Sequence, residues 1–169
     1  MLFRSFDQAL IRYARRKHQV LIGERTAEEI KLTLGCVYHS ERDDVMEVRG
    51  RDMLTGLPRM FPIHSEEMLE AFEEVCEDLL EGIRSVLERT PPELVADVAE
   101  NGITLCGGGS LLWGLDKLIE ANTNIRTHVA DDADSCVAYG IEKALSWLSD
   151  MHEGTINLMR RKQMLHGRE

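Results

Sequence analysis

The spacing of apolar residues predicts helices at the beginning and in the middle of the chain. Residues 5–18 and 66–89 carry apolar side chains at three- and four-residue steps, the pattern of a helix with one buried face. The first helix ends in a basic run, Arg15 to His18, and the second has an acidic opposite face. We interpret both charged stretches as solvated surface rather than as binding patches. The apolar stripe of the first helix consists of Phe6, Leu10, Tyr13 and Ala14.

Between these helices the pattern changes to that of strands. Residues 36–63 alternate between polar and apolar positions, and Thr55-Gly56 supplies a turn between two runs. Pro58 and Pro62 lack a backbone donor and are tolerated at sheet edges. The segment therefore predicts a small sheet with exposed edges.

Hydroxyl residues mark three expected helix starts. Thr26 to Glu29 forms a capping box, in which the Thr26 hydroxyl accepts a backbone N–H and Glu29 reaches back, and this helix should end near Gly35. Ser65 is expected to cap the helix over 66–89, and Thr90 the helix over 91–100. All three are expected to bond through their side chains.

The most distinctive stretch follows, over residues 102–115. A short strand at 103–105 leads into Gly107, Gly108 and Gly109, and an apolar helix is expected to open at Ser110. Glycines let the backbone approach a ligand closely, and the N-terminus of a helix favours phosphate. The same three glycines are also compatible with a tight turn and no ligand. Spacing alone leaves both interpretations open.

The rest of the chain completes an α/β pattern. A second strand is expected at 127–130, followed by a helix in which Gly140 allows close packing. The order of elements predicts a strand–helix–strand core with a small inserted α+β subdomain. We expect residues 1–35 and 90–150 to form the core part and 36–89 the small subdomain. Residues 151–169 are expected to be a flexible tail.

Composition excludes several classes of function. The formal net charge of -10 argues against nucleic acid as a partner and against direct attraction to an anionic membrane. The four cysteines are far apart, and they and the six scattered histidines suggest neither a disulfide framework nor a metal site. No apolar run reaches the roughly 20 residues of a membrane span. We expect a soluble, cytoplasmic protein without a membrane anchor of its own.

Candidate chemistry is sparse. No Ser-His-Asp or Cys-His set, P-loop or GxGxxG pattern occurs. Glu28 and Lys31 are three residues apart on one helix, so they could form a surface ion pair or a polar clamp on a ligand. Periodicity does not decide between the two.

Five blocks together resemble the bacterial actin homologues of the MreB family, which includes the paralogues called Mbl. The blocks are GERTAEEIK (23–31), VRGRDMLTGLP (48–58), VLERTPPEL (86–94), GITLCGGGSLLWGLDKLI (102–119) and HVADDADSCVAYG (128–140). The resemblance implies a lobe of the actin/Hsp70-like ATPase fold, in which ATP with magnesium lies in a cleft between two lobes. The implied nucleotide-binding residues are Glu28, Glu29, Ile30, Lys31, Gly107, Gly108, Gly109, Ser110 and Leu111.

The departures from the family pattern restrict what is expected of this chain. The two phosphate loops and the catalytic acid of the family have no counterpart here, so the chain is expected to correspond to the C-terminal lobe alone. We therefore assign no catalytic residue and expect feeble or absent ATP binding and no hydrolysis by the chain alone. The face toward the other lobe should expose apolar surface.

By resemblance, the expected function is that of a truncated member of an ATP-dependent cytoskeletal filament family that sets rod cell shape by organising cell-wall synthesis. Its implied partners are actin-like protomers of the same family, by self-association or capping, and, through filaments, membrane proteins of cell shape and wall synthesis. Association with the membrane would also occur through filaments. The alternatives are a nucleotide-dependent enzyme or regulatory domain of the sugar kinase/Hsp70 superfamily, or a non-functional remnant.

Overall fold

The computed structural model of the chain describes residues 2–39 and 43–150. The expected tail at 151–169 lies outside the described residues. The first half contains α1 (Leu2–Tyr13), the π-helical turn η1 (Ala14–His18), β1 (Val20–Leu21), α2 (Glu24–Leu34), β2 (Val45–Asp52), β3 (Pro58–His64) and α3 (Glu67–Arg89). The second half contains α4 (Pro92–Asn101), β4 (Ile103–Leu105), the 3-10 turn η2 (Gly108–Leu111), α5 (Leu115–Thr123), β5 (Thr127–Val129) and α6 (Cys136–Asp150).

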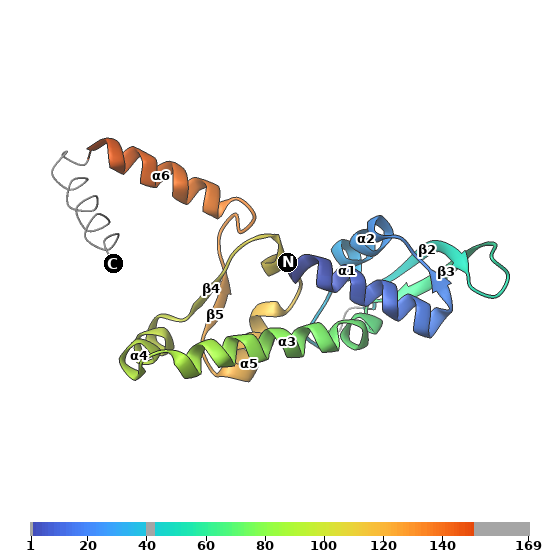
Figure 1. The fold of residues 1–169 in the computed structure, drawn as a ribbon, viewed down its shortest axis with the longest axis horizontal. Coiled ribbons are helices and arrows are strands. Elements are labelled where there is room, and N and C mark those ends of the chain that lie inside the picture. Colours follow the sequence, from blue (N-terminus) through green and yellow to red (C-terminus); the bar gives the residue numbers. More distant parts are fainter. Residues whose placement is uncertain (1, 40–42, 151–169) are drawn as a thin grey trace, which may run out of the picture.

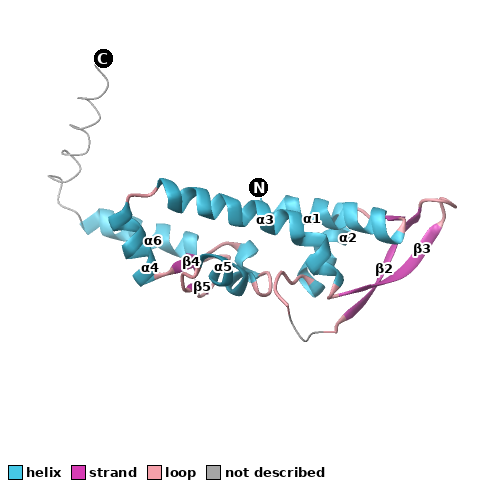
Figure 2. Ribbon diagram, turned by 90° about the horizontal axis from the view of Figure 1, so that it is seen from below, coloured by secondary structure: helices cyan, strands magenta, loops and turns pink. Residues whose placement is uncertain are grey.

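The described residues form an elongated molecule with a sheet toward each end (Figure 1). Strands β1, β2 and β3 form an antiparallel sheet in that order at one end, and β4 and β5 pair in parallel toward the other. Helix α3 runs along the molecule between them, as Figure 2 also shows. The expected turn at Thr55-Gly56 between two paired strands and the expected strand–helix–strand unit are both confirmed.

The core lies where α1, α2 and α3 meet the first sheet. All four residues of the predicted stripe on the first helix are buried. Phe6 meets Phe72 of α3 edge-on, with ring centroids 5.0 Å apart. Val48 and Phe61 are paired across β2 and β3 and are also buried, which closes the sheet onto the helices. The amphipathic pattern of the first helix therefore predicted its buried face correctly.

Strand β1, which comes from residues 1–35, pairs with β2, which comes from 36–89. The division of the chain into a core part and a small subdomain stays a prediction.

The three predicted hydroxyl caps are wrong, although all three helices form. Helix α2 begins at Glu24, because the Gly23 carbonyl already accepts the N–H of Ala27. The Ser65 hydroxyl instead accepts the N–H of Asp44, and the Thr90 hydroxyl donates to the Val86 carbonyl one turn back. The Ser65 and Thr90 hydroxyls thus bond to backbone groups outside the first turns of the helices that they were expected to cap.

The prediction that an apolar helix opens at Ser110 is also wrong. Gly108–Leu111 is a single 3-10 turn, and the Ser110 hydroxyl closes it by donating to the Gly107 carbonyl at 2.7 Å. Helix α5 begins only at Leu115, after Gly114 turns the chain with a φ of 80°. The glycine loop is therefore followed by a tight turn and not directly by an α-helix.

Helix α6 forms as predicted but exposes its apolar side chains. A Cβ built on Gly140 would meet nothing within 4 Å, so the prediction that this glycine allows close packing is wrong among the described residues. The large exposed apolar residues of this helix are Val137, Tyr139, Ile141, Leu145 and Trp147. That the face toward another lobe exposes apolar surface stays a prediction.

Candidate functional site

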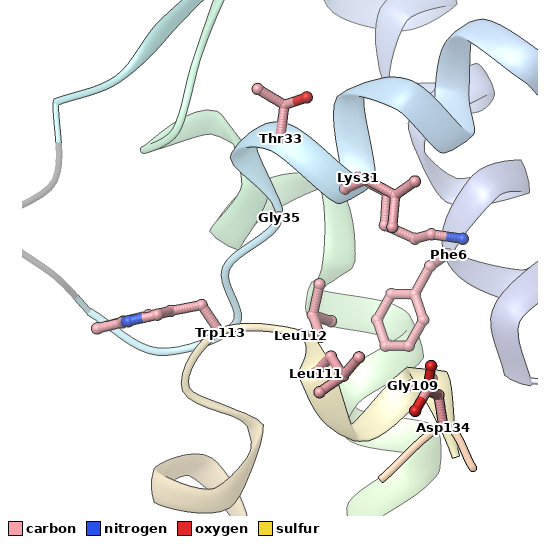
Figure 3. A pocket seen from close by; sticks show the side chains of 11 residues that line it. Phe6, Lys31, Thr33, Gly35, Gly109, Leu111, Leu112, Trp113 and Asp134 are labelled. Atoms are coloured by element: carbon pink, nitrogen blue, oxygen red, sulfur yellow. The ribbon is translucent and has the colours of Figure 1, made fainter. Parts of the chain in front are cut away.

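A cavity of about 540 Å³ lies between the end of α2 and the Gly108–Leu111 turn. Figure 3 shows Phe6, Leu111 and Leu112 gathered on one side of it, with Asp134 beside Gly109. Most of the lining is apolar, which suits a flat, weakly polar group. The lining residues are Phe6, Lys31, Leu32, Thr33, Gly35, Gly108, Gly109, Leu111, Leu112, Trp113 and Asp134.

Two glycines allow the walls of this cavity to approach each other. The segment after α2 passes the segment after η2, where the Val37 N–H donates to the Trp113 carbonyl at 3.0 Å. A Cβ on Gly35 would lie 2.6 Å from Leu112 Cδ1, and one on Gly114 would lie 2.6 Å from Tyr38 Cβ. Side chains at these positions would force the two segments apart.

Lys31 is buried and points away from the surface. Its Nζ lies 2.7 Å from Asp7 Oδ1 in α1, and the lysine side chain is 4% exposed. Of the two possibilities left open for Glu28 and Lys31, a surface ion pair does not fit a lysine in this position. Lys31 therefore contributes its stem to the cavity wall while its charge is balanced by Asp7.

The structure brings together most, but not all, of the residues implied by the resemblance. Lys31, Gly108, Gly109 and Leu111 line the cavity. Glu28 and Glu29 line an adjoining hollow of about 380 Å³, which shares Leu32 and Thr33 with it. The remaining three serve the local fold, because Ile30 is core, Gly107 has a φ of 83°, and Ser110 is buried and bonded to the Gly107 carbonyl. Ligand contact by any of the nine stays a prediction.

Other lining residues were missed by sequence reasoning. Leu32 and Thr33 directly follow Lys31 on the same helix, and Trp113 directly follows the GGGSLL run, so proximity in the sequence could have found them. Phe6 and Asp134 are distant in sequence and carry no such signal. Asp134 adds negative charge beside the glycines, which disfavours a phosphate at that point.

A second polar cluster joins the first helix to the third. Glu67 Oε2 accepts a bond from the Tyr13 hydroxyl at 3.0 Å and lies 2.7 Å from His18 Nε2. Glu70 Oε2 accepts a hydrogen bond from the Tyr13 hydroxyl at 3.2 Å and forms a salt bridge with Lys17 Nζ at 3.2 Å. The basic run and the acidic face are solvent-exposed over most of their length, as interpreted, but their charges also pair with each other, and His18 and Glu67 are half-buried where they meet.

These contacts shift the titration of the groups involved. Burial raises the pKa of Glu67, but bonds from the His64 N–H, His18 and Tyr13 outweigh it, so the net pKa is lowered. Lys17 donates to Glu70 and lowers the pKa of that carboxyl. Burial, followed by the bond to Glu67, raises the pKa of Tyr13. The phenol therefore stays a proton donor to both carboxylates.

Within residues 2–39 and 43–150, no three His, Cys, Asp or Glu side chains are grouped so that they could hold a metal ion. No helix in the same part of the chain combines the length and apolar character needed to cross a membrane.

Known proteins of one family match most of this chain. The family model MreB/Mbl protein matches residues 4–153. The chain is 44% identical over 151 residues to the cell shape-determining protein MreB of Escherichia coli (strain K12), covering 89% of this chain and 43% of that protein. It is 44% identical over 136 residues to the cell shape-determining protein Mbl of Bacillus cereus, covering 80% and 41% respectively. The chain thus spans less than half the length of these relatives.

Solved structures give the same picture. MreB 5 of Spiroplasma citri bound to AMPPNP is 32% identical with a TM-score of 0.81, covering 97% of this chain and 46% of that one. The MamK double helical filament is 21% identical with a TM-score of 0.62, which is a likeness of fold.

Proposed function

The chain belongs to the MreB/Mbl family, and on that basis we propose that it acts in an actin-like filament system that determines cell shape. The expected fold class, an α/β lobe of actin-like type, is confirmed by the superposition on MreB 5. The match of the family model across residues 4–153 is the observation that carries the proposal. Because the chain spans less than half the length of these relatives, we propose their function for it and do not assign it.

We propose that the cavity between α2 and Gly108–Leu111 receives the base and sugar end of ATP. MreB5 of Spiroplasma citri binds ADP and AMPPNP. In this chain the apolar lining suits a purine ring, and Glu28 and Glu29 of the adjoining hollow supply carboxylates that could accept bonds from ribose hydroxyls. Asp134 beside Gly109 supports the base-side orientation, since its charge would repel a phosphate.

The affinity of this cavity for nucleotide is proposed to be feeble. Phosphate and magnesium contacts usually supply much of the affinity for ATP, and the one lysine in the cavity lining has its charge balanced by Asp7. The remaining contacts must offset the full cost of immobilising the ligand. We expect no hydrolysis of ATP by the chain alone.

The proposed partners are protomers of the same family, which the chain would join or cap at the end of a filament. Head-to-tail contacts extend only when both ends of a protomer offer their surfaces. Contact with membrane proteins of wall synthesis, and a place beneath the cytoplasmic membrane, would follow through such filaments.

Co-sedimentation with full-length Escherichia coli MreB tests this proposal. In ATP and magnesium, we expect the chain to pellet with polymerised MreB and to remain in the supernatant when spun alone. Serum albumin, as a protein of no relation, controls for trapping in the pellet. A chain that stays in the supernatant at every MreB concentration would contradict the proposed function.

A further inference from the structure

Two cysteines lie on the two loops that meet beside the cavity. Cys106 directly follows β4 and precedes the glycine run, while Cys136 begins α6 after the turn that contains Asp134. Strands β4 and β5 are parallel, so the loops that follow them leave the same edge of the sheet. A bond between the two thiols would therefore join two stretches of the cavity wall.

Hydrogen bonds hold these two loops together next to the cysteines. The Gly107 N–H donates to the Ala133 carbonyl at 2.5 Å, and the Cys136 Sγ lies 3.4 Å from the same oxygen. Because the Cys106 carbonyl carbon is bonded to the Gly107 nitrogen, it lies within about 7 Å of the Cys136 Sγ. In a disulfide these two atoms are roughly 4–6 Å apart, so a small movement of the loops brings the sulfurs together.

Exposure separates this pair from the other two cysteines of the chain. Cys106 is exposed and Cys136 is half-buried, whereas both of the others are buried. Burial raises the pKa of the Cys76 thiol to about 11, and the Cys36 Sγ donates to the Ser65 carbonyl at 3.2 Å. An oxidant in solution therefore reaches Cys106 first, and the two buried cysteines serve as internal controls.

The oxidant must approach a loop that is rich in carboxylates. Asp131, Asp132 and Asp134 are all exposed on the turn that leads to Cys136. A hydroperoxide is small and uncharged, so these carboxylates do not repel it. Hydrogen peroxide is therefore an oxidant that suits this pair.

We propose that hydrogen peroxide converts Cys106 and Cys136 into a reversible disulfide. The Cys106 sulfur attacks the peroxide, the O–O bond breaks, and a sulfenic acid and one water are formed. The Cys136 sulfur then attacks the Cys106 sulfur and forms the S–S bond, and the hydroxyl group leaves with the thiol proton as a second water. The two thiols are oxidised by two electrons, and one peroxide is reduced to two waters.

The disulfide places the cavity under redox control, a consequence that rests on the proposed nucleotide site. Gly108 and Gly109, which line the cavity, directly follow Cys106 and Gly107 in the chain. Asp134 lines the cavity as well and lies beside Gly109 in Figure 3. Drawing the two loops together narrows the space between them, so nucleotide binding should weaken by about fivefold or more in the oxidised chain.

Peptide mapping after oxidation tests the disulfide directly. The full chain is treated with hydrogen peroxide and alkylated, and the monomer band of a non-reducing gel is digested with trypsin. Cleavage after lysine and arginine places Cys106 in peptide 90–117 and Cys136 in peptide 127–143. We expect these two peptides to be joined, with a mass lower by two hydrogens than their sum, and dithiothreitol should separate them.

The other cysteines and two single variants provide the controls. The peptides of Cys36 and Cys76 should carry the alkyl group in every sample. Cys106→Ser and Cys136→Ser should each abolish the joined peptide, with circular dichroism showing that both variants are folded. A joined peptide found only in dimers, or Cys106 recovered as a sulfinic acid while Cys136 is alkylated, would overturn the disulfide in the wild-type chain alone.

A nucleotide titration tests the redox control of the cavity. In amide NMR, ATP should shift Gly108 and Gly109 in the reduced chain and bind about fivefold more weakly to the oxidised chain. Cys106→Ser treated with peroxide should keep the affinity of the reduced chain. Equal affinities of the two wild-type forms would overturn the redox control and leave the disulfide intact. A reduced chain that binds no ATP would contradict the proposed nucleotide site, a result that is separate from the peptide map.

Discussion

Glu67 shows how one side chain connects two helices that are distant in the sequence. Its carboxylate accepts hydrogen bonds from the Tyr13 hydroxyl and the His64 N–H and lies against His18. Only 18% of the Glu67 side chain is exposed. A charged acceptor that makes several bonds at a half-buried site contributes more than an ordinary surface pair. The sequence displayed the charges of this cluster but gave no sign of which of them would meet.

The lowered pKa of Glu67 makes its contribution dependent on pH. A carboxyl whose folded pKa lies below its unfolded value stabilises the protein fully above the unfolded value and loses that effect as the pH falls through the folded one. We expect Glu67→Gln to lower the free energy of unfolding by about 1–2 kcal/mol at pH 7. The difference from wild type should shrink below about pH 4.

Urea unfolding of both proteins at a series of pH values measures this. Glu73→Gln is the matched control, because Glu73 lies on the same helix and is exposed, and its effect should stay within about 0.5 kcal/mol. A Glu67→Gln penalty that is the same at pH 3 and pH 7 would show that the carboxylate charge plays no part.

Among the elements, the helices and strands were predictable but their junctions were not. Apolar periodicity gave the stripe of α1 and the hairpin of β2 and β3, because burial of one face determines which residues must be apolar. The caps at Thr26, Ser65 and Thr90 were predicted wrongly, since a hydroxyl chooses among several backbone partners that a sequence does not display.

The junction that shapes the cavity depends on Gly114. Its φ of 80° is unfavourable for residues with a Cβ, and a Cβ there would lie 2.6 Å from Tyr38 Cβ. We expect Gly114→Ala to lower the free energy of unfolding by about 2 kcal/mol or more. Gly82→Ala is the contrasting variant, because Gly82 lies within α3 with nothing near its Cβ position, and alanine there should stabilise by about 0.5–1 kcal/mol.

Chemical denaturation of the two glycine variants compares them directly. Equal unfolding midpoints for Gly114→Ala and the wild type would mean that the segments after α2 and η2 can separate without loss. The close contact between these two segments would then contribute nothing to the stability of the cavity walls.

At the scale of the whole molecule, the candidate site came from resemblance and not from pattern. The glycine run by itself left a phosphate seat and a tight turn equally open, and the structure adds a 3-10 turn with Asp134 beside it. Phe6 and Asp134 join the site from distant parts of the chain, which no local spacing foretells. The apolar pattern predicted helix α6 itself, but it predicted neither the exposure of its apolar side chains nor the open space around Gly140.

The central claim is that the cavity between α2 and the glycine turn is the base-side wall of an actin-type nucleotide site. Titration of the isotope-labelled chain with ATP and magnesium, followed by amide NMR, tests it most directly. We predict progressive shifts at Thr33, Gly108 and Gly109, with Gly82 unmoved and a dissociation constant weaker than about 0.1 mM. Shifts centred elsewhere, no shifts at about 5 mM nucleotide, or saturation at micromolar concentration would contradict the account.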